Sequence, residues 1–289
     1  MRAAQTGKEP VTLSAMEQLV PESLRIYRDE IAYSILPADM KFYIQLCKWP
    51  RFRNWIIRIS EKMIPGAYAS LLLRKHFIDQ KLFDKKEDVS AVIELGAGFD
   101  TRSLRYCSIC ELPFFELDFP DTMKAKERRI RKVNPSALEK IKLCGIDFDR
   151  DDIRSALQRH GFPEAFDKRV FFIWEGVTPY LTESGIHKTF EFLRSAERGS
   201  YLAFTYIDEK FINGNDRMGW DAAYKQYVQS GLWKFGLSPK TCGSFLQQYG
   251  WRLIEDIVPG EVASADILEK RGLQTSDVER IVFAVKESM

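Results

Sequence analysis

The sequence predicts an α/β fold: a doubly wound, mostly parallel, seven-stranded Rossmann-like sheet with an N-terminal helical cap. Three observations predict it. From about residue 85, short apolar runs alternate with helical patterns, which is typical of βαβ units with right-handed crossovers. A glycine-containing turn, at Gly96 and Gly98, follows the first of these runs. Residues 14–84 instead show helical periodicity and no strand pattern.

The cap is the first element. Residues 1–13 are polar, and we expect them to be disordered or loosely held. Ser14 and Glu17 have the spacing of a capping box, and prolines divide the segment that follows into four helical stretches. We therefore predict a helical cap over residues 1–84, followed by a Rossmann-like domain over residues 85–289.

Residues 41–64 of the cap mix basic side chains with large apolar ones. A basic amphipathic helix of this kind can lie on a membrane surface. The commoner arrangement places the aromatic rings, including Trp49 and Trp55, on the core or in a ligand pocket, with the cations solvated. We expect the commoner arrangement and keep surface association as the alternative.

The first predicted strand, residues 91–95, is apolar apart from Glu94, which suits a parallel strand buried on both faces. Gly96 and Gly98 then turn the chain. Because they lack a Cβ, a ligand can approach the backbone closely, and nucleotide-containing cofactors bind at such turns. An ordinary glycine turn between strand and helix is about equally common, so the turn alone does not decide.

The second predicted strand strengthens the cofactor interpretation. It ends in Asp118, 22 positions after Gly96, near the spacing at which a carboxylate accepts hydrogen bonds from ribose hydroxyls. Glu116 lies on the same face of that strand, but the strand's end favours Asp118. The charged segment that follows, residues 124–132, is typical of a solvated helix face.

Two further strands approach the same edge of the sheet. Residues 141–146 precede Asp147 and Phe148, and residues 169–174 precede Glu175. Ligands of doubly wound sheets bind at the carboxyl edge of the strands. Asp147 or Asp149 could instead cap the helix that begins near residue 151, and Asp149 suits that role better.

The remainder of the chain completes the sheet. Residues 201–207 form the fifth predicted strand, and an aromatic-rich insertion near 208–240 is expected to fold over the cleft. A helix over 239–250 then precedes two closing strands, at 251–258 and 280–286, which we expect to be antiparallel.

Three segments carry a family resemblance: Glu-Leu-Gly-Ala-Gly-Phe-Asp-Thr-Arg (94–102), Glu-Leu-Asp-Phe-Pro (116–120) and Glu-Gly-Val-Thr-Pro-Tyr-Leu-Thr (175–182). They resemble successive motifs of the leucine carboxyl methyltransferase family, which includes bacterial O-methyltransferases of polyketide type. The resemblance implies a methyltransferase sheet with S-adenosylmethionine as cofactor and methyl donor.

The resemblance also implies roles for individual residues. Arg74 would hold the donor's carboxylate. Without the family match, a role in a surface salt bridge would be equally compatible with the sequence. Asp147 and Phe148 would contact the adenine. Tyr180, the catalytic candidate, would border the methyl-transfer site or else be a core residue with a satisfied hydroxyl. The predicted cofactor-binding residues are Arg74, Glu94, Gly96, Gly98, Asp118, Asp147, Phe148 and Glu175.

Composition excludes other classes. A net charge of +2 over 289 residues does not indicate the basic surface of a nucleic-acid-binding protein. No run of eighteen apolar residues is present to span a membrane. The five cysteines are an odd number, and the N-terminus shows no apolar signal, so we expect a cytoplasmic protein. Cys107 and Cys110 have metal-ligand spacing, but no second pair follows and we expect no metal. No obligate protein partner is evident.

We therefore expect a methyltransferase acting on a carboxylate or hydroxyl oxygen of a small, hydrophobic molecule. A nicotinamide-dependent oxidoreductase is the alternative that the glycine turn and the ribose acid would also allow, although Asp100 stands where a third glycine would have supported it. A donor-binding or membrane-surface protein without turnover is the other alternative.

Overall fold

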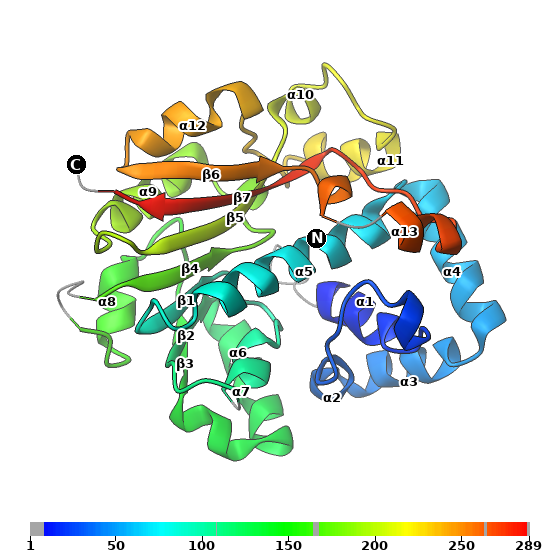
Figure 1. The fold of residues 1–289 in the computed structure, drawn as a ribbon, viewed down its shortest axis with the longest axis horizontal. Helices are drawn as coiled ribbons and strands as arrows, with labels where there is room; N and C mark the ends of the chain where they lie inside the picture. Colours follow the sequence, from blue (N-terminus) through cyan, green and yellow to red (C-terminus); the bar gives the residue numbers. More distant parts are fainter. Residues whose placement is uncertain (1–8, 108, 164–167, 263–264, 288–289) are drawn as a thin grey trace.

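The computed structural model describes residues 9–107, 109–163, 168–262 and 265–287. The predicted seven-stranded α/β sheet is confirmed, with strand order β3-β2-β1-β4-β5-β7-β6 (Figure 1). The pairs among β1 to β5 are parallel, and β7 runs antiparallel to both β5 and β6. The strands are β1 (Ala91–Leu95), β2 (Phe114–Asp118), β3 (Ile141–Gly145), β4 (Val170–Trp174), β5 (Tyr201–Ile207), β6 (Trp251–Ile257) and β7 (Glu279–Lys286).

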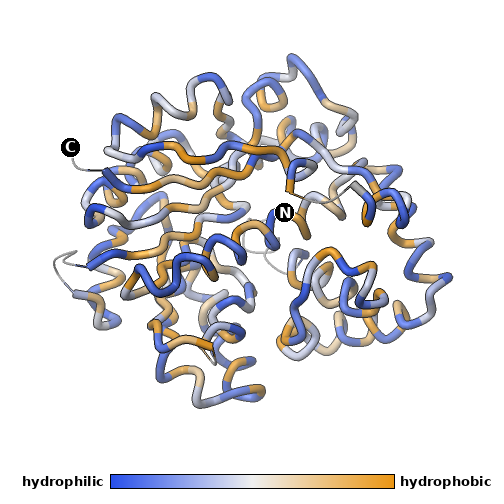
Figure 2. Tube along the Cα trace, in the orientation of Figure 1, coloured by the Kyte–Doolittle hydropathy of each residue, from blue (hydrophilic) through white to orange (hydrophobic). Residues whose placement is uncertain are grey.

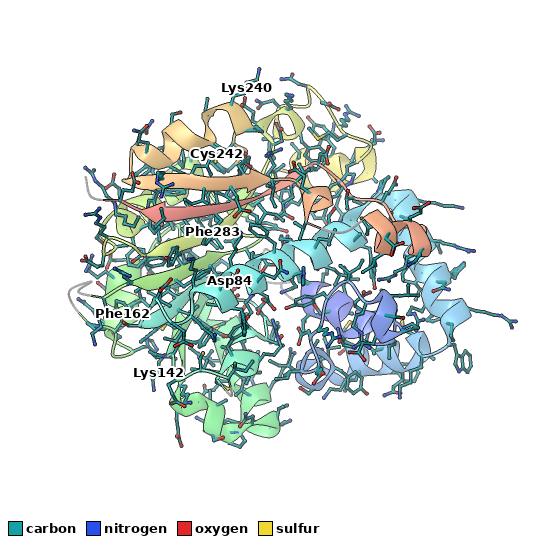
Figure 3. All side chains as sticks on the ribbon, in the orientation of Figure 1. Asp84, Lys142, Phe162, Lys240, Cys242 and Phe283 are labelled. Carbon is teal, nitrogen blue, oxygen red and sulfur yellow. The ribbon has the colours of Figure 1, made fainter. Side chains whose placement is uncertain are left out.

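Helices cover both faces of the sheet. Apolar residues of α5, α6 and α7 pack on one face, and those of α8, α9 and α12 pack on the other. Phe283 on β7 belongs to the first cluster and Cys242 on α12 to the second (Figure 3). These helices are α5 (Ala67–Lys85), α6 (Arg102–Tyr106), α7 (Pro120–Val133), α8 (Ile153–Gln158), α9 (Glu183–Arg194) and α12 (Pro239–Gln247).

The cap precedes the sheet and shares its core. It consists of α1 (Glu9–Glu17), α2 (Ala32–Ile35), α3 (Ala38–Cys47) and α4 (Pro50–Met63), which lead into α5. Val11, Ile35 and Ile44 of the cap belong to the same buried cluster as one face of the sheet. The apolar segments in Figure 2 accordingly extend from the strands into the cap. Burial of this common surface holds the cap against the sheet.

The predicted start of the cap is wrong in two respects. The loosely held start was expected to reach residue 13, but α1 begins at Glu9 within the described residues; residues 1–8 lie outside them. Ser14 and Glu17 do not form a capping box, because both lie inside α1. Glu17 is buried and accepts hydrogen bonds from Tyr68 Oη (2.6 Å) and Arg271 Nη1 (2.7 Å). Arg271 ends α13 (Ala265–Arg271), so this carboxylate joins α1 to α13.

The charged segment over residues 124–132 lies on α7 and is not wholly solvated. Lys126 is fully buried, with its Nζ 2.5 Å from Glu116 Oε2. The exception has a physical cause, since Glu116 is a buried carboxylate that requires a counter-charge.

The insertion after β5 lies between the cap and the loop after β4. It contains α10 (Glu209–Ile212), α11 (Asp221–Ala223) and a π-helical turn, η5 (Tyr224–Val228). Trp220 Nε1 donates to Pro65 O in the cap (2.7 Å), and the backbone N–H of Lys234 donates to Pro179 O (2.6 Å). These bonds fix the insertion over the carboxyl edge of the sheet.

Candidate active site

A large cavity of about 1030 Å³ lies at the carboxyl edge of β1, β2 and β4. Its walls come from α1, α4, α5 and the 208–240 insertion. The volume is at the upper end of the range for small-molecule sites. One half is polar and glycine-lined, and the other half is mainly apolar. We call them the donor half and the acceptor half.

The glycine turn after β1 borders the donor half. Gly96 and Gly98 both have positive φ, +79° and +48°. A Cβ at Gly96 would lie 2.2 Å from Val177 Cγ2, so both its dihedral and its surroundings require glycine. Gly98 N–H donates to Asp118 Oδ2 at 2.8 Å, which ties the turn to the end of β2.

Asp118 lies in the cavity wall as well. Its second oxygen accepts from the N–H of Phe119 at 2.7 Å. Burial raises the pKa of Asp118, and the two backbone donors oppose that rise. Glu116, on the same strand face, does not line the cavity, because it is fully buried against Lys126.

A network of buried charges forms the floor of the donor half. Arg102 is its centre: the guanidinium is fully buried and contacts four carboxylates. The distances are 2.6 Å to Asp79, 3.2 Å to Glu94, 3.1 Å to Asp100 and 2.5 Å to Glu175. Opposite charges at these distances offset the cost of removing each group from water.

Arg74 connects this network to the end of the sheet. Its Nε donates to Glu175 Oε1 at 2.8 Å, and its Nη1 contacts both oxygens of Glu279, at 2.7 and 2.8 Å. These bonds use Nε and Nη1 and leave Nη2 out, and the residue lines the cavity. Arg74 is buried, so the surface salt bridge considered from the sequence is wrong. The contact with Glu279 was missed, because 205 residues separate the two partners.

Two carboxyl groups in this wall have opposite pKa shifts. Burial alone would raise the pKa of Glu175, but Arg102, Lys75 and Arg74 outweigh it and lower the pKa to about 2. Burial and the negative charge of Asp100 raise the pKa of Glu94 well above its usual value. Glu94 Oε2 has no hydrogen-bond partner among the described residues.

The turn after β3 supplies two more residues predicted from the sequence. Asp147 and Phe148 both line the cavity, and Phe148 is buried. The expected capping role of Asp149 is wrong: its Oδ1 accepts from Thr182 Oγ1 at 3.0 Å. Asp152 caps α8, accepting the N–H of Ser155 at 2.7 Å, because the chain completes a turn before the helix begins.

Aromatic rings from two segments enclose the acceptor half. Tyr180 packs edge-on against Trp233, with centroids 6.3 Å apart, and Tyr227 stacks on the same indole at 4.7 Å. Ile64 and Leu71 complete this wall. The expected role for Trp49 and Trp55 is wrong. They are 72% and 57% exposed and do not line the cavity.

The acceptor half contains few groups able to take a proton at neutral pH. None of the three histidines lines the cavity. Burial, together with Glu9 and Tyr180, raises the pKa of Tyr227 to about 12, so its hydroxyl is protonated. Burial also raises the pKa of Glu9, which is on the rim.

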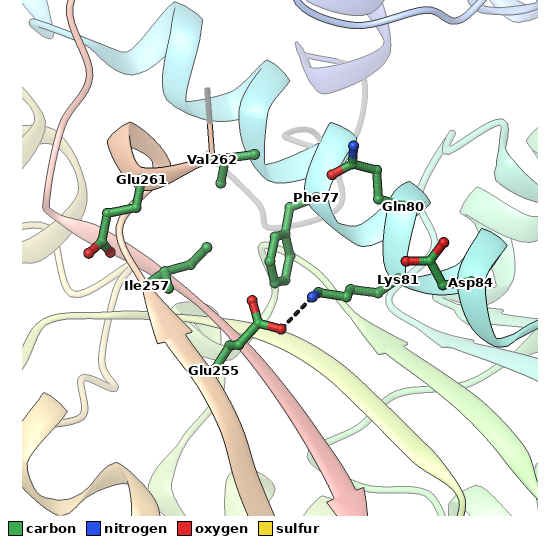
Figure 4. Close-up of a pocket in the computed structure, with 8 residues that line it drawn as sticks. All are labelled: Phe77, Gln80, Lys81, Asp84, Glu255, Ile257, Glu261 and Val262. Atoms are coloured by element: carbon green, nitrogen blue, oxygen red, sulfur yellow. Dashed lines mark hydrogen bonds and ion pairs between the residues drawn. The ribbon is translucent and has the colours of Figure 1, made fainter. Parts of the chain in front are cut away.

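A second, smaller cavity of about 380 Å³ lies between α5 and β6 (Figure 4). It shares no lining residue with the large cavity. Lys81 pairs with Glu255 across it, and the ammonium also lies 4.8 Å from the centroid of Phe77. The Lys81 ammonium is therefore already neutralised by Glu255.

Comparisons with known proteins agree with this architecture. Residues 10–194, more than half of the chain, match the sequence profile of the leucine carboxyl methyltransferase family. A candidate S-adenosyl-L-methionine-dependent methyltransferase of Mycolicibacterium smegmatis is 23% identical over 201 residues; the alignment covers 68% of this chain and 66% of that relative.

Two solved structures share the fold. A DUF574 family protein from Streptomyces avermitilis has a TM-score of 0.59 and 12% identity, over 94% of this chain and 100% of that chain. A candidate methyltransferase from Thermobifida fusca has a TM-score of 0.56 and 14% identity, over 80% of this chain and 86% of that chain.

Proposed function

The chain belongs to the leucine carboxyl methyltransferase family of S-adenosylmethionine-dependent enzymes, and we propose that it methylates an oxygen of a small apolar molecule, preferentially a carboxylate. The observation that carries this proposal is the continuity of the large cavity. It connects the glycine turn and the charge network directly to the aromatic wall around Tyr180. In this proposal the cap and the 208–240 insertion enclose the acceptor.

The donor half fits the methyl donor on grounds of its own chemistry. S-adenosylmethionine has a cationic amine, a carboxylate, a ribose and an adenine. Nη2 of Arg74, which takes no part in that residue's bonds to Glu175 and Glu279, would hold the carboxylate, and the Glu94 carboxyl, whose Oε2 has no partner among the described residues, would face the amine beside Glu175. Asp118 would accept from the ribose hydroxyls, and Asp147, with Phe148, would contact the adenine. Gly96 and Gly98 would let the donor approach the backbone.

The donor, when bound, supplies a methyl group already activated by its positively charged sulfur. The protein's part is then to hold the acceptor oxygen in line with that methyl and to exclude water. Alignment of this kind contributes up to about 7 to 11 kcal/mol in favourable systems. Trp233 and Tyr227 form a rigid apolar wall for the acceptor, and Tyr180 borders the junction between the two halves.

The shortage of proton acceptors in the acceptor half favours a carboxylate over a hydroxyl as the methyl acceptor. An ionised acid is nucleophilic without a base, whereas an alcohol or phenol must lose a proton near the reaction site. No histidine is available in the cavity, and Tyr227 retains its own proton. A carboxylate acceptor requires neither residue as a base, because it is already ionised.

The test is to incubate the protein with methyl-labelled donor and an organic extract of cells, then to treat the product with mild alkali. A methyl ester releases labelled methanol under these conditions, whereas a methyl ether or N-methyl product does not. Alkali-labile label supports the proposal. Alkali-stable label on oxygen would replace the carboxylate by a hydroxyl, and label on nitrogen, carbon or sulfur would reject oxygen as the acceptor atom. Gly96→Val, which blocks the donor half, is the control for enzyme-dependent labelling.

A further inference from the structure

The outer surface of the cap concentrates exposed apolar side chains. Ten large apolar residues are exposed in the described part of the chain, and six of them lie between residues 42 and 63. They are Phe42 (67% exposed), Leu46, Trp49 (72%), Trp55 (57%), Ile59 and Met63 (56%). α4 forms the edge of the molecule farthest from the sheet in Figure 1. Clusters of this kind on a monomer mark interaction sites.

The exposed apolar residues of α4 form one stripe, which Trp49 extends at the start of the helix. Trp55, Ile59 and Met63 recur at intervals of four residues, which places them on one face of the helix. Phe52 also stacks on Trp55, with centroids 5.9 Å apart. The helix packs into the cap through Arg53 and Ile57, with Phe52 and Ile56 half-buried against the core. The stripe of Trp55, Ile59 and Met63 is therefore left facing solvent.

Cations border this stripe. Lys48, Arg51, Arg58 and Lys62 are exposed, and none has a carboxylate partner among the residues that the structure describes. The one acid of α4, Glu61, is occupied: its Oε2 accepts from the N–H of Gly66 at 2.9 Å. The positive charge along the stripe is therefore not neutralised by the protein itself.

We propose that the exposed face of α4, with Trp49 at its start, docks on an anionic lipid bilayer surface. An amphipathic helix with aromatic residues on one face and Lys or Arg beside it lies in the membrane interface, where indole rings and cations are both favoured. Charge complementarity selects this occupant over a second copy of the chain. A symmetric dimer through this face would bring two unneutralised cationic borders together. None of the stripe residues lines either cavity, so they protrude, as insertion requires.

Docking in this orientation has a consequence for the substrate. Ser60 and Ile64, on and just after α4, line the acceptor half of the large cavity. The stripe and the cavity wall are thus consecutive on one short segment. Resting on the proposed function, this proximity favours an acceptor taken from the bilayer: an amphiphile with an acid head group and an apolar body. No helix in the described ranges is long and apolar enough to cross a membrane, so the contact is with the surface.

The experiment is co-sedimentation of the full chain with two vesicle preparations: phosphatidylcholine alone, and phosphatidylcholine with a quarter of phosphatidylglycerol. We expect binding to the anionic vesicles that weakens with added salt. The double variant Trp49→Ser, Trp55→Gln should bind at least about tenfold more weakly. Phe83→Ser is the matched control, since Phe83 is an exposed aromatic residue (52%) outside the stripe, and it should bind as the parent does.

Failure of the parent chain to bind anionic vesicles, or equal binding by the double variant, overturns the proposal. So does a parent dimer in sedimentation that the double variant converts to monomer, because the stripe is then a protein interface. Calorimetry with S-adenosylhomocysteine keeps the two proposals separate. Vesicle binding without donor binding overturns the proposed function and leaves docking intact, and the converse overturns docking alone.

Discussion

Glu175 is the residue through which the charge network can be measured most directly. Its side chain is 6% exposed and lies 2.8 Å from Arg74 Nε and 2.5 Å from Arg102 Nη2, with Lys75 at 3.8 Å. Glu175→Gln keeps the shape of the side chain and removes its charge. The three cations around it, all of them buried, then lose one carboxylate partner.

The pKa of Glu175 gives the magnitude. Lowering it from 4.5 to about 2 corresponds to about 3 kcal/mol of stabilisation by the ionised form. Because the folded-state pKa is the lower one, this stabilisation is fully present above about pH 4.5 and is lost as the pH falls toward about 2. The free energy of unfolding of Glu175→Gln should thus be lower than that of the parent by about 3 kcal/mol at pH 7, and by about 1.5 kcal/mol at pH 3.

Urea unfolding followed by circular dichroism at the two pH values measures this difference. The matched control is Glu191→Gln, since Glu191 is 58% exposed on α9 and 3.7 Å from Arg194. It should change the free energy of unfolding by no more than about 0.5 kcal/mol at either pH. Equal losses in the two variants, or a Glu175→Gln loss that does not depend on pH, would refute the reasoning.

Four further predictions test the two halves of the cavity. Asp118→Ala should weaken S-adenosylhomocysteine binding by about 1 to 3 kcal/mol in calorimetry, and NAD should not bind; unchanged affinity in a folded variant removes Asp118 from the donor site. Gly96→Ala should abolish donor binding and lower the melting temperature, because its Cβ would lie 2.2 Å from Val177 Cγ2; full binding would show that the turn adjusts. Trp233→Ala should raise the KM for the acceptor while the Kd of the donor stays constant, and a changed donor Kd would contradict the division into halves. With two carboxylic acids of different pKa, the rate should show no acceptor-linked rise between about pH 6 and about pH 9, where a phenol would show one.

The strands were predictable because each signal is local. Parallel strands buried on both faces appear as short apolar runs, and all five runs before the insertion form strands near the expected bounds. The acids at the ends of β1, β2 and β4 were predictable for a related reason. The carboxyl ends of parallel strands meet at one edge of the sheet. The cavity accordingly contains Glu94, Asp118 and Glu175, each of which lies at or beside the end of a strand.

The contacts of the charge network were not predictable from spacing. Glu279 reaches Arg74 across 205 residues, and Glu17 reaches Arg271 across 254. Lys126 resembles its solvated neighbours in sequence, yet β2 presents a buried Glu116 to it. Partner choice in each case depends on which elements meet in space.

By itself, the sequence determined the positions of the strands along the chain, the glycine turn and the acids at the sheet edge, because these depend on residues adjacent in the chain. Only the tertiary structure decided which face of α4 is buried. Periodicity shows that Trp55, Ile59 and Met63 share a face, but it contains no information on what packs against that face. The cap buries Arg53 and Ile57 instead, and Trp55, Ile59 and Met63 are left facing solvent.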